Sequence, residues 1–160
     1  MRKILHTLAD MEDLLACNRR SVQFWTDAGA LIPTADTRHM GRGVHRLFDS
    51  AEVVVGLIVR AAAQIQLPIG RLVSIATVVR REWLQDPEHK AILNSGIAGT
   101  AQVFMVIESG NRLVLLKNPP VDEAVEATFQ EMVHANSIDD SWKGLIHLTP
   151  WLRRAKSTLT

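Results

Sequence analysis

The chain has 160 residues, of which 47% are hydrophobic and 22% are charged, and its formal net charge at neutral pH is +1. A chain of this length buries about 68–70% of the surface that its unfolded form exposes, so it can form a core without disulfides. The composition is too apolar for a disordered protein, and the small net charge argues against a protein that is basic over its whole surface. A single cysteine excludes an internal disulfide framework and a site built from several thiolates.

Apolar runs in the sequence are too short for the hydrophobic region of a signal peptide or for a membrane span. The longest, residues 53–65, is interrupted by Arg60 and Gln64. We therefore expect a cytoplasmic protein, of bacterial or phage type, and one associated with the nucleoid if it binds DNA.

Charge divides the chain near residue 84. Residues 1–83 contain 11 Lys and Arg against 8 Asp and Glu, a net of +3, whereas residues 84–160 contain 7 against 9, a net of −2. We predict two domains with this boundary, and we expect the basic one to meet an acidic partner.

Two short helices are predicted first. Thr7 and Asp10 have the spacing of a capping box, and the apolar residues that follow would share one helix face. A break at residues 16–18 ends in Asn18, a good N-cap, and the second helix covers residues 19–28 and stops before Gly29. Two helices of this length joined by about three residues have helix-turn-helix spacing. The residues expected on the inner faces are Leu8, Met11, Leu14, Leu15, Val22 and Trp25.

A polar stretch and two further helices complete the first half. Gly41 and Gly43 permit a tight turn, and the residues around them could pair as a short two-stranded wing. Asp49 and Glu52 again resemble a capping box and open a helix, and Pro68 suits the first turn of the next one, over residues 69–83. The expected buried positions are Val53, Val54, Leu57, Ile58, Ala61, Ile65, Ile69, Leu72, Val73, Ala76, Val79 and Trp83.

The second half changes to a pattern of strands and helices. A short helix is expected at residues 86–94, a hairpin at residues 101–108 and 112–117, an amphipathic helix at residues 120–135, and a third strand at residues 144–148. Thr149 and Pro150 would be N-cap and first residue of a final helix over residues 150–159. The fold class is therefore α+β and mainly helical, with a winged helix-turn-helix followed by a small antiparallel sheet with flanking helices.

The second predicted helix carries side-chain hydrogen-bond donors of the kind that recognise the edges of bases in DNA. Guanine offers paired acceptors in the major groove and adenine an acceptor beside a donor, which suit Arg and Gln. In a helix-turn-helix, residues at the start of the second helix face those edges. The candidate DNA-binding residues on this helix are Asn18, Arg19, Arg20, Gln23 and Phe24.

The loop after this helix adds four candidate contacts to phosphates or to the minor groove. They are Arg38, Arg42, His45 and Arg46. Residues 19–46 hold five Arg and two Asp, which gives this segment a local charge of +3. A solvated basic helix and loop without a nucleic-acid partner is the alternative interpretation.

Over residues 8–75 the chain resembles the MerR family of winged helix-turn-helix regulators. The matching features, in chain order, are a short first helix, an Arg-rich second helix ending in an aromatic pair (Phe24 and Trp25), the segment Gly29-Ala30-Leu31-Ile32-Pro33, a Gly/Arg loop, Phe48 before the acidic cap at residues 49–52, and a helix pair.

The resemblance implies that Arg19, Arg20 and Gln23 face the major groove, with Arg42, His45 and Arg46 as wing contacts. The family usually has Tyr-Tyr at the aromatic pair. Phe24 lacks the hydroxyl that can reach a phosphate, so it would pack against the sugar-phosphate backbone or in the core. The Gly29–Pro33 segment is one residue longer than the commonest form, so the resemblance defines the register of the wing only to within about one residue.

The resemblance also implies a transcriptional regulator that binds double-stranded DNA as a homodimer and responds through a variable C-terminal region. Residues 69–83 could begin a dimer helix or could be the last core helix of the first domain, and residues 150–159 are a second candidate for the dimer contact. The C-terminal half could also bind a small effector or a protein partner.

Other function classes have less support in the sequence. The six His residues are scattered without the spacing of metal ligands, and motifs such as GxSxG, a P-loop or GxGxxG after a strand are missing. We expect no enzymatic activity, no catalytic residue, no metal and no cofactor. Two alternatives stay open: an excisionase-like factor that bends DNA, and a protein-interaction adaptor that acts through residues 84–160.

Overall fold

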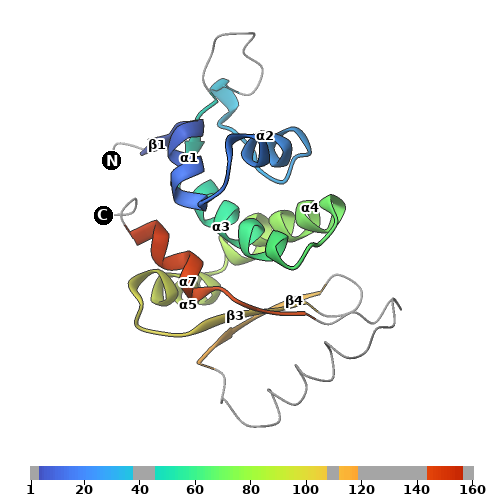
Figure 1. Ribbon diagram of the computed structural model, residues 1–160. Helices are drawn as coiled ribbons and strands as arrows, with labels where there is room; N and C mark the ends of the chain where they lie inside the picture. The colour runs from blue at the N-terminus through green and yellow to red at the C-terminus, as the bar shows by residue number, and fades with distance from the viewer. Residues whose placement is uncertain (1–3, 38–45, 108–111, 119–143, 157–160) are drawn as a thin grey trace.

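The computed structural model describes residues 4–37, 46–107, 112–118 and 144–156 (Figure 1). Within these ranges the chain is a mixed α+β protein, mainly helical, with two small antiparallel sheets. This confirms the predicted fold class at the level of α+β composition. None of the described helices is both long enough and apolar enough to cross a bilayer.

The first two helices begin where their capping residues predict. α1 (Leu8–Leu15) starts after Thr7, whose side chain and that of Asp10 form both halves of a capping box. α2 (Arg19–Asp27) starts after Asn18, whose carbonyl oxygen Oδ1 accepts the N–H of Ser21 at 2.9 Å. Because each cap satisfies N–H groups that the first helical turn leaves unpaired, these short helices have defined beginnings.

Strand β1 (Leu5–His6) pairs antiparallel with β2 (Phe48–Asp49), which the sequence did not predict. On the near side of the predicted wing the chain forms a 3₁₀ turn, η1 (Ala35–Thr37), and the N–H of Thr34 donates to the carbonyl oxygen of Leu47 on the far side at 2.7 Å. The glycines expected at the wing tip lie outside the described residues.

Helix α3 (Ser50–Gln64) runs through the middle of the molecule (Figure 1). Its residues 52–59 are all buried, because helices and strands surround it on several sides. Gly56 allows the close approach of α1, since a Cβ there would lie 3.0 Å from a methyl carbon of Leu15. The predicted burial of Ile65 is wrong: it lies past the end of α3 and is 40% exposed.

Helix α4 (Ile69–Val78) follows Pro68, which is its N-cap, one position before the predicted first turn. The helix continues as a π-helical turn, η2 (Val79–Trp83), in which the N–H of Leu84 donates to the carbonyl oxygen of Val79 at 2.9 Å. Val79 and Trp83 are buried as predicted, whereas Ile69 and Val73 are only half-buried.

The second half supplies a helix and a three-stranded sheet. α5 (Pro87–Ala98) begins after its N-cap Asp86, and the strands β3 (Val103–Ile107), β4 (Leu113–Lys117) and β5 (Gly144–His147) pair antiparallel in the order β4-β3-β5. These elements confirm the predicted short helix, hairpin strands and third strand. The predicted helix at residues 120–135 lies outside the described residues.

The last described elements are α7 (Thr149–Leu152) and the 3₁₀ turn η4 (Arg153–Ala155). Thr149 is inside α7 and is not its N-cap, which is Leu148. The prediction failed because the hydroxyl of Thr149 has a tertiary partner: it accepts the N–H of Val103 at 2.7 Å and ties α7 to β3.

One continuous buried cluster joins both halves of the described chain. Met11, Val22 and Leu57 from the first half belong to the same cluster as Met105 and Leu152 from the second. α5 packs on β3 and β4, and α7 contacts both α3 and α5 (Figure 1). The second half is therefore packed directly against the helices of the first, and the domain boundary at residue 84 stays a prediction.

Candidate nucleic-acid interface

The two faces of α2 differ sharply in exposure. Val22 is fully buried and Trp25 is 6% exposed, whereas Arg19, Arg20 and Gln23 are exposed to solvent. Apolar side chains on one face thus hold the helix on the core, and the opposite face presents guanidinium and amide groups. These are donors that pair with phosphates or with base edges.

Phe24 lies on the outward side of α2 and is 56% exposed. Its ring therefore does not belong to the core, which was one of the two roles open to it. A large apolar side chain exposed beside polar and basic ones is typical of a contact surface.

The entry turn, residues 16–18, connects α1 to α2. Ala16 has a left-handed backbone with φ of 46°, and its N–H and that of Cys17 close the end of α1 on the carbonyl oxygens of Asp13 and Glu12. Asn18 then caps α2 with its side chain. Since that side chain is already bonded to Ser21, its role in the described structure is to orient α2.

The exit turn, residues 28–32, leaves α2 through Gly29, whose φ of 85° favours glycine. The N–H groups of Ala30 and Leu31 both donate to the carbonyl oxygen of Trp25, at 2.8 and 3.1 Å. Ala30 and Leu31 are fully buried, so the turn is packed into the core.

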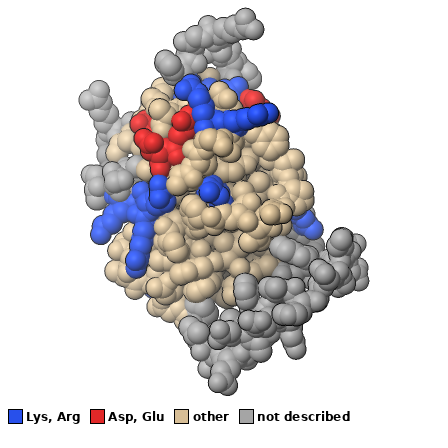
Figure 2. Space-filling view, in the orientation of Figure 1, with Lys and Arg blue, Asp and Glu red and all other residues tan. Residues whose placement is uncertain are grey.

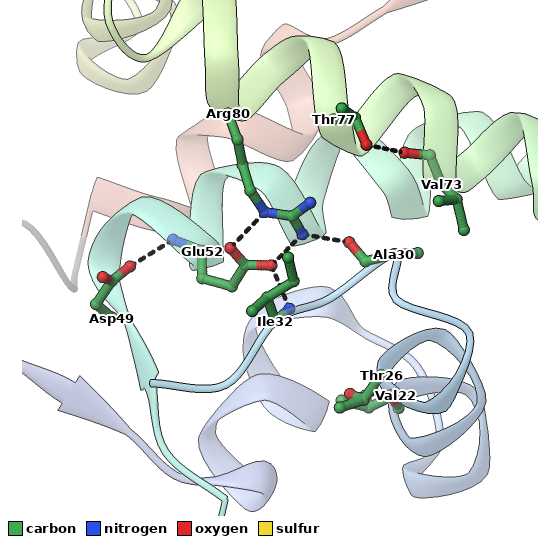
Figure 3. A network of polar contacts seen from close by, with 9 residues as sticks. All are labelled: Val22, Thr26, Ala30, Ile32, Asp49, Glu52, Val73, Thr77 and Arg80. Carbon is green, nitrogen blue, oxygen red and sulfur yellow. Dashed lines mark hydrogen bonds and ion pairs between the residues drawn. The ribbon is translucent and has the colours of Figure 1, made fainter. Parts of the chain in front are cut away.

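A buried ion pair holds the exit turn in place (Figure 3). The carboxylate of Glu52 on α3 accepts the N–H of Ile32 at 2.7 Å and the Nε–H of Arg80 at 2.9 Å. The same guanidinium donates from Nη2 to the Glu52 carboxylate and to the carbonyl oxygen of Ala30. The side chains are 8% and 19% exposed, so a charge that would be costly to bury alone is paired and hydrogen-bonded.

Acidic groups border the basic face of α2. Nε of Arg19 lies 3.8 Å from a carboxylate oxygen of Glu12, and Nη1 of Arg46 lies 2.9 Å from one of Asp27. The side chains of Arg19 and Arg46 are 60% and 40% exposed, and those of Glu12 and Asp27 are 27% and 65% exposed, so water and salt screen both pairs. Both arginines can exchange such a carboxylate for a phosphate.

Figure 2 shows Lys and Arg side chains in separate groups on one face of the molecule, with a group of acidic side chains between them. α1 carries three acidic residues, Asp10, Glu12 and Asp13. An approaching polyanion would be repelled by α1 and attracted by α2, which limits the candidate interface to α2 and the residues after it.

The structure brings six of the nine predicted site residues together. Asn18, Arg19, Arg20, Gln23 and Phe24 come together on α2, and Arg46 joins them through Asp27 at the end of that helix. Arg38, Arg42 and His45 lie outside the described residues, so the predicted wing contacts stay predictions.

Sequence reasoning missed the residues that fix the ends of α2. Glu52 and Arg80 are 28 residues apart, and Arg154, which donates to the end of α1, is 140 residues from its acceptor Leu14. No local pattern joins residues at such separations. Glu52 lies directly before the apolar run and was predicted only as half of a capping box; its N–H does bond to Asp49, but its carboxylate bonds to Ile32 and Arg80 instead.

Burial raises the pKa of the Cys17 thiol in the entry turn, although the positive charge of Arg60 opposes this. The thiol is therefore a slow nucleophile at neutral pH. Among the described residues, no three His, Cys, Asp or Glu side chains gather as metal ligands would.

Comparisons with protein-family models and with curated proteins give no match to this chain. A functional proposal therefore rests on the geometry and charge of α1, α2 and their flanking turns alone.

Proposed function

We propose that the protein binds double-stranded DNA in a sequence-specific manner through the outward face of α2 and acts as a transcriptional regulator. The observation that carries the proposal is the exposure of Arg19, Arg20, Gln23 and Phe24 on a helix whose opposite face is buried. In this proposal α1 and α2 are the two helices of a MerR-like helix-turn-helix.

The size of α2 suits the major groove. An α-helix with its side chains is about 10–12 Å in diameter, and the nine residues of α2 make it about 14 Å long. The groove of B-DNA is about 12 Å wide and admits one α-helix. Residues in the first turn then lie deepest, where Arg19 or Arg20 can donate two hydrogen bonds to a guanine and Gln23 can pair with an adenine.

Phe24 would contact the DNA backbone or the methyl group of a thymine. Its ring lacks a hydrogen-bonding group, so it adds apolar contact area next to the polar contacts of Gln23. Arg46 would exchange Asp27 for a phosphate, and Arg38, Arg42 and His45 would extend the contact along the backbone.

A homodimer would place two copies of α2 on half-sites related by a two-fold axis. Selection of bound duplexes from a random pool tests this together with DNA binding. We expect enrichment of an inverted repeat with half-sites about one helical turn apart. Recovery of unrelated sequences would contradict the regulator and favour a non-specific, architectural factor, and recovery of none would favour the adaptor.

The role of α2 is tested on the enriched duplex by Arg19→Ala/Arg20→Ala. We expect at least tenfold weaker binding, because each guanine contact contributes about 1–3 kcal/mol of discrimination. Lys90→Ala/Lys117→Ala is the matched control, since it removes the same charge from exposed positions on α5 and β4. If the two variants bind the duplex with equal affinity, α2 is not part of the DNA interface.

A further inference from the structure

The C-terminal end of the described chain is bonded to the end of α1. The Arg154 guanidinium in η4 donates from Nε to the carbonyl oxygen of Leu14 at 2.6 Å and from Nη2 to that of Asp13 at 2.7 Å. The last carbonyls of an α-helix have no i+4 partner within it. A planar guanidinium can bridge two of them, and its charge is favourable at a helix C-terminus.

A second arginine strengthens this junction. Arg60 of α3 has its Cζ 5.1 Å from the centre of the Trp151 ring on α7, in the geometry of a cation–π contact. Its Nη2 lies 3.5 Å from the carbonyl oxygen of Ala16, a long contact. Leu152 and Ala155 are fully buried, so the segment that carries Arg154 is fixed in the core.

The position of the end of α1 determines how α2 is presented. Only residues 16–18 separate the two helices, and Ala16 already has a left-handed backbone that a non-glycine residue adopts with strain. A three-residue turn has few free torsions, so a shift of the last turn of α1 moves the first turn of α2. That first turn holds Arg19 and Arg20.

We propose that Arg154 is a positioning residue for α2: its bonds to the carbonyls of Asp13 and Leu14 hold the entry turn and thereby orient the DNA-facing side chains. The second half of the chain then takes part in DNA binding without contacting DNA. The functional part rests on the proposed DNA binding, whereas the hold on the entry turn can be tested without DNA.

Cys17 reports on the entry turn. It is the one cysteine in the sequence and is half-buried, so the alkylation rate of the intact protein by iodoacetamide measures opening of this turn. We expect Arg154→Ala to raise that rate about fivefold, the factor that corresponds to the net contribution of one ordinary intramolecular hydrogen bond. Arg153→Ala is the matched control, because its guanidinium lies beside Gly99 of α5 instead.

DNA affinity supplies the second measurement. We expect Arg154→Ala to weaken binding to the enriched duplex about fivefold. The slope of log Kd against log salt should stay unchanged, whereas loss of a phosphate contact would reduce it by about one. Arg154→Lys should give intermediate values in both experiments, because an ammonium group lacks the planar pair of N–H donors with which the guanidinium binds both carbonyl oxygens. If Arg154→Ala does not fold, Arg154→Lys takes its place in both experiments.

The outcomes separate the two proposals. An unchanged Cys17 rate in Arg154→Ala overturns the hold on the entry turn. A faster rate with unchanged DNA affinity overturns the positioning role but leaves DNA binding intact, and a reduced salt slope makes Arg154 a direct DNA contact instead. If the wild-type protein binds no DNA, the proposed function fails, while the Cys17 rate still decides whether Arg154 holds the turn.

Discussion

The two turns that flank α2 are held by arginines from later in the chain, but in different surroundings. At the exit turn, Arg80 and Glu52 are largely buried, and their hydrogen bonds reach Ala30 and Ile32 in the core. At the entry turn, the bonds of Arg154 are exposed to water. Buried bonds have no solvent substitute, so the exit turn should support global stability. The exposed bonds of the entry turn should mainly set the orientation of α2.

The largest effect is expected at the exit turn. Arg80→Ala leaves the Glu52 carboxylate, 8% exposed, without its positively charged partner, and should lower the free energy of unfolding by about 3 kcal/mol or more. Urea denaturation measures this. Arg81→Ala removes the exposed neighbour of Arg80 in η2 and should lower the free energy of unfolding by less than about 0.5 kcal/mol. Similar losses in both variants would contradict a structural role for the buried pair.

A smaller effect is expected from the cap of α2. Asn18→Ala removes the acceptor of the Ser21 N–H and should lower the free energy of unfolding by about 1 kcal/mol. Asn18→Asp keeps an acceptor at the helix N-terminus and should retain the wild-type value within about 0.5 kcal/mol. Equal destabilisation in the two variants would show that the bond between Asn18 and the Ser21 N–H contributes little to the free energy of unfolding.

Arg154→Ala should lower the free energy of unfolding much less than Arg80→Ala, by no more than about 1 kcal/mol, because water can replace its exposed hydrogen bonds. The same urea titration measures this value. A loss as large as that of Arg80→Ala would remove the distinction between the two turns.

The smallest effect concerns pH at the other end of α1. Hydrogen bonds from the N–H and hydroxyl of Thr7 lower the pKa of Asp10 below its ordinary value. The ionised carboxylate therefore stabilises the fold above about pH 4, and this contribution is lost as the pH falls through the folded-state pKa. Asp10→Asn should flatten the decline in unfolding free energy below pH 4. Parallel declines in the two proteins would contradict this role.

Sequence patterns predicted the elements of this fold whose cause is local. The caps at Thr7 and Asn18 bond to residues three positions away, so both partners of each bond lie close together in the sequence. The outward face of α2 follows in the same way, because burial of Val22 and Trp25 determines which side chains face solvent.

Long-range packing explains what the sequence could not predict. Strand β1 forms only because Leu5 and His6 meet Phe48 and Asp49, and Thr149 bonds to Val103 instead of capping a helix. Such partners depend on the complete fold. Arg80 and Arg154, which hold the two ends of α2, also depend on such long-range contacts. The exposed residues of the candidate site were therefore predictable from the sequence, whereas the residues that hold α2 in place were not.

The central claim, that the outward face of α2 reads DNA, is tested most directly by a ratio of affinities. The ratio compares Kd for the enriched duplex with Kd for a scrambled duplex at physiological salt, in the wild type and in Arg19→Ala/Arg20→Ala. We predict a preference of at least about 10³ in the wild type, and a loss of most of it in the double variant. A double variant that keeps both the wild-type affinity and the wild-type preference would contradict the claim.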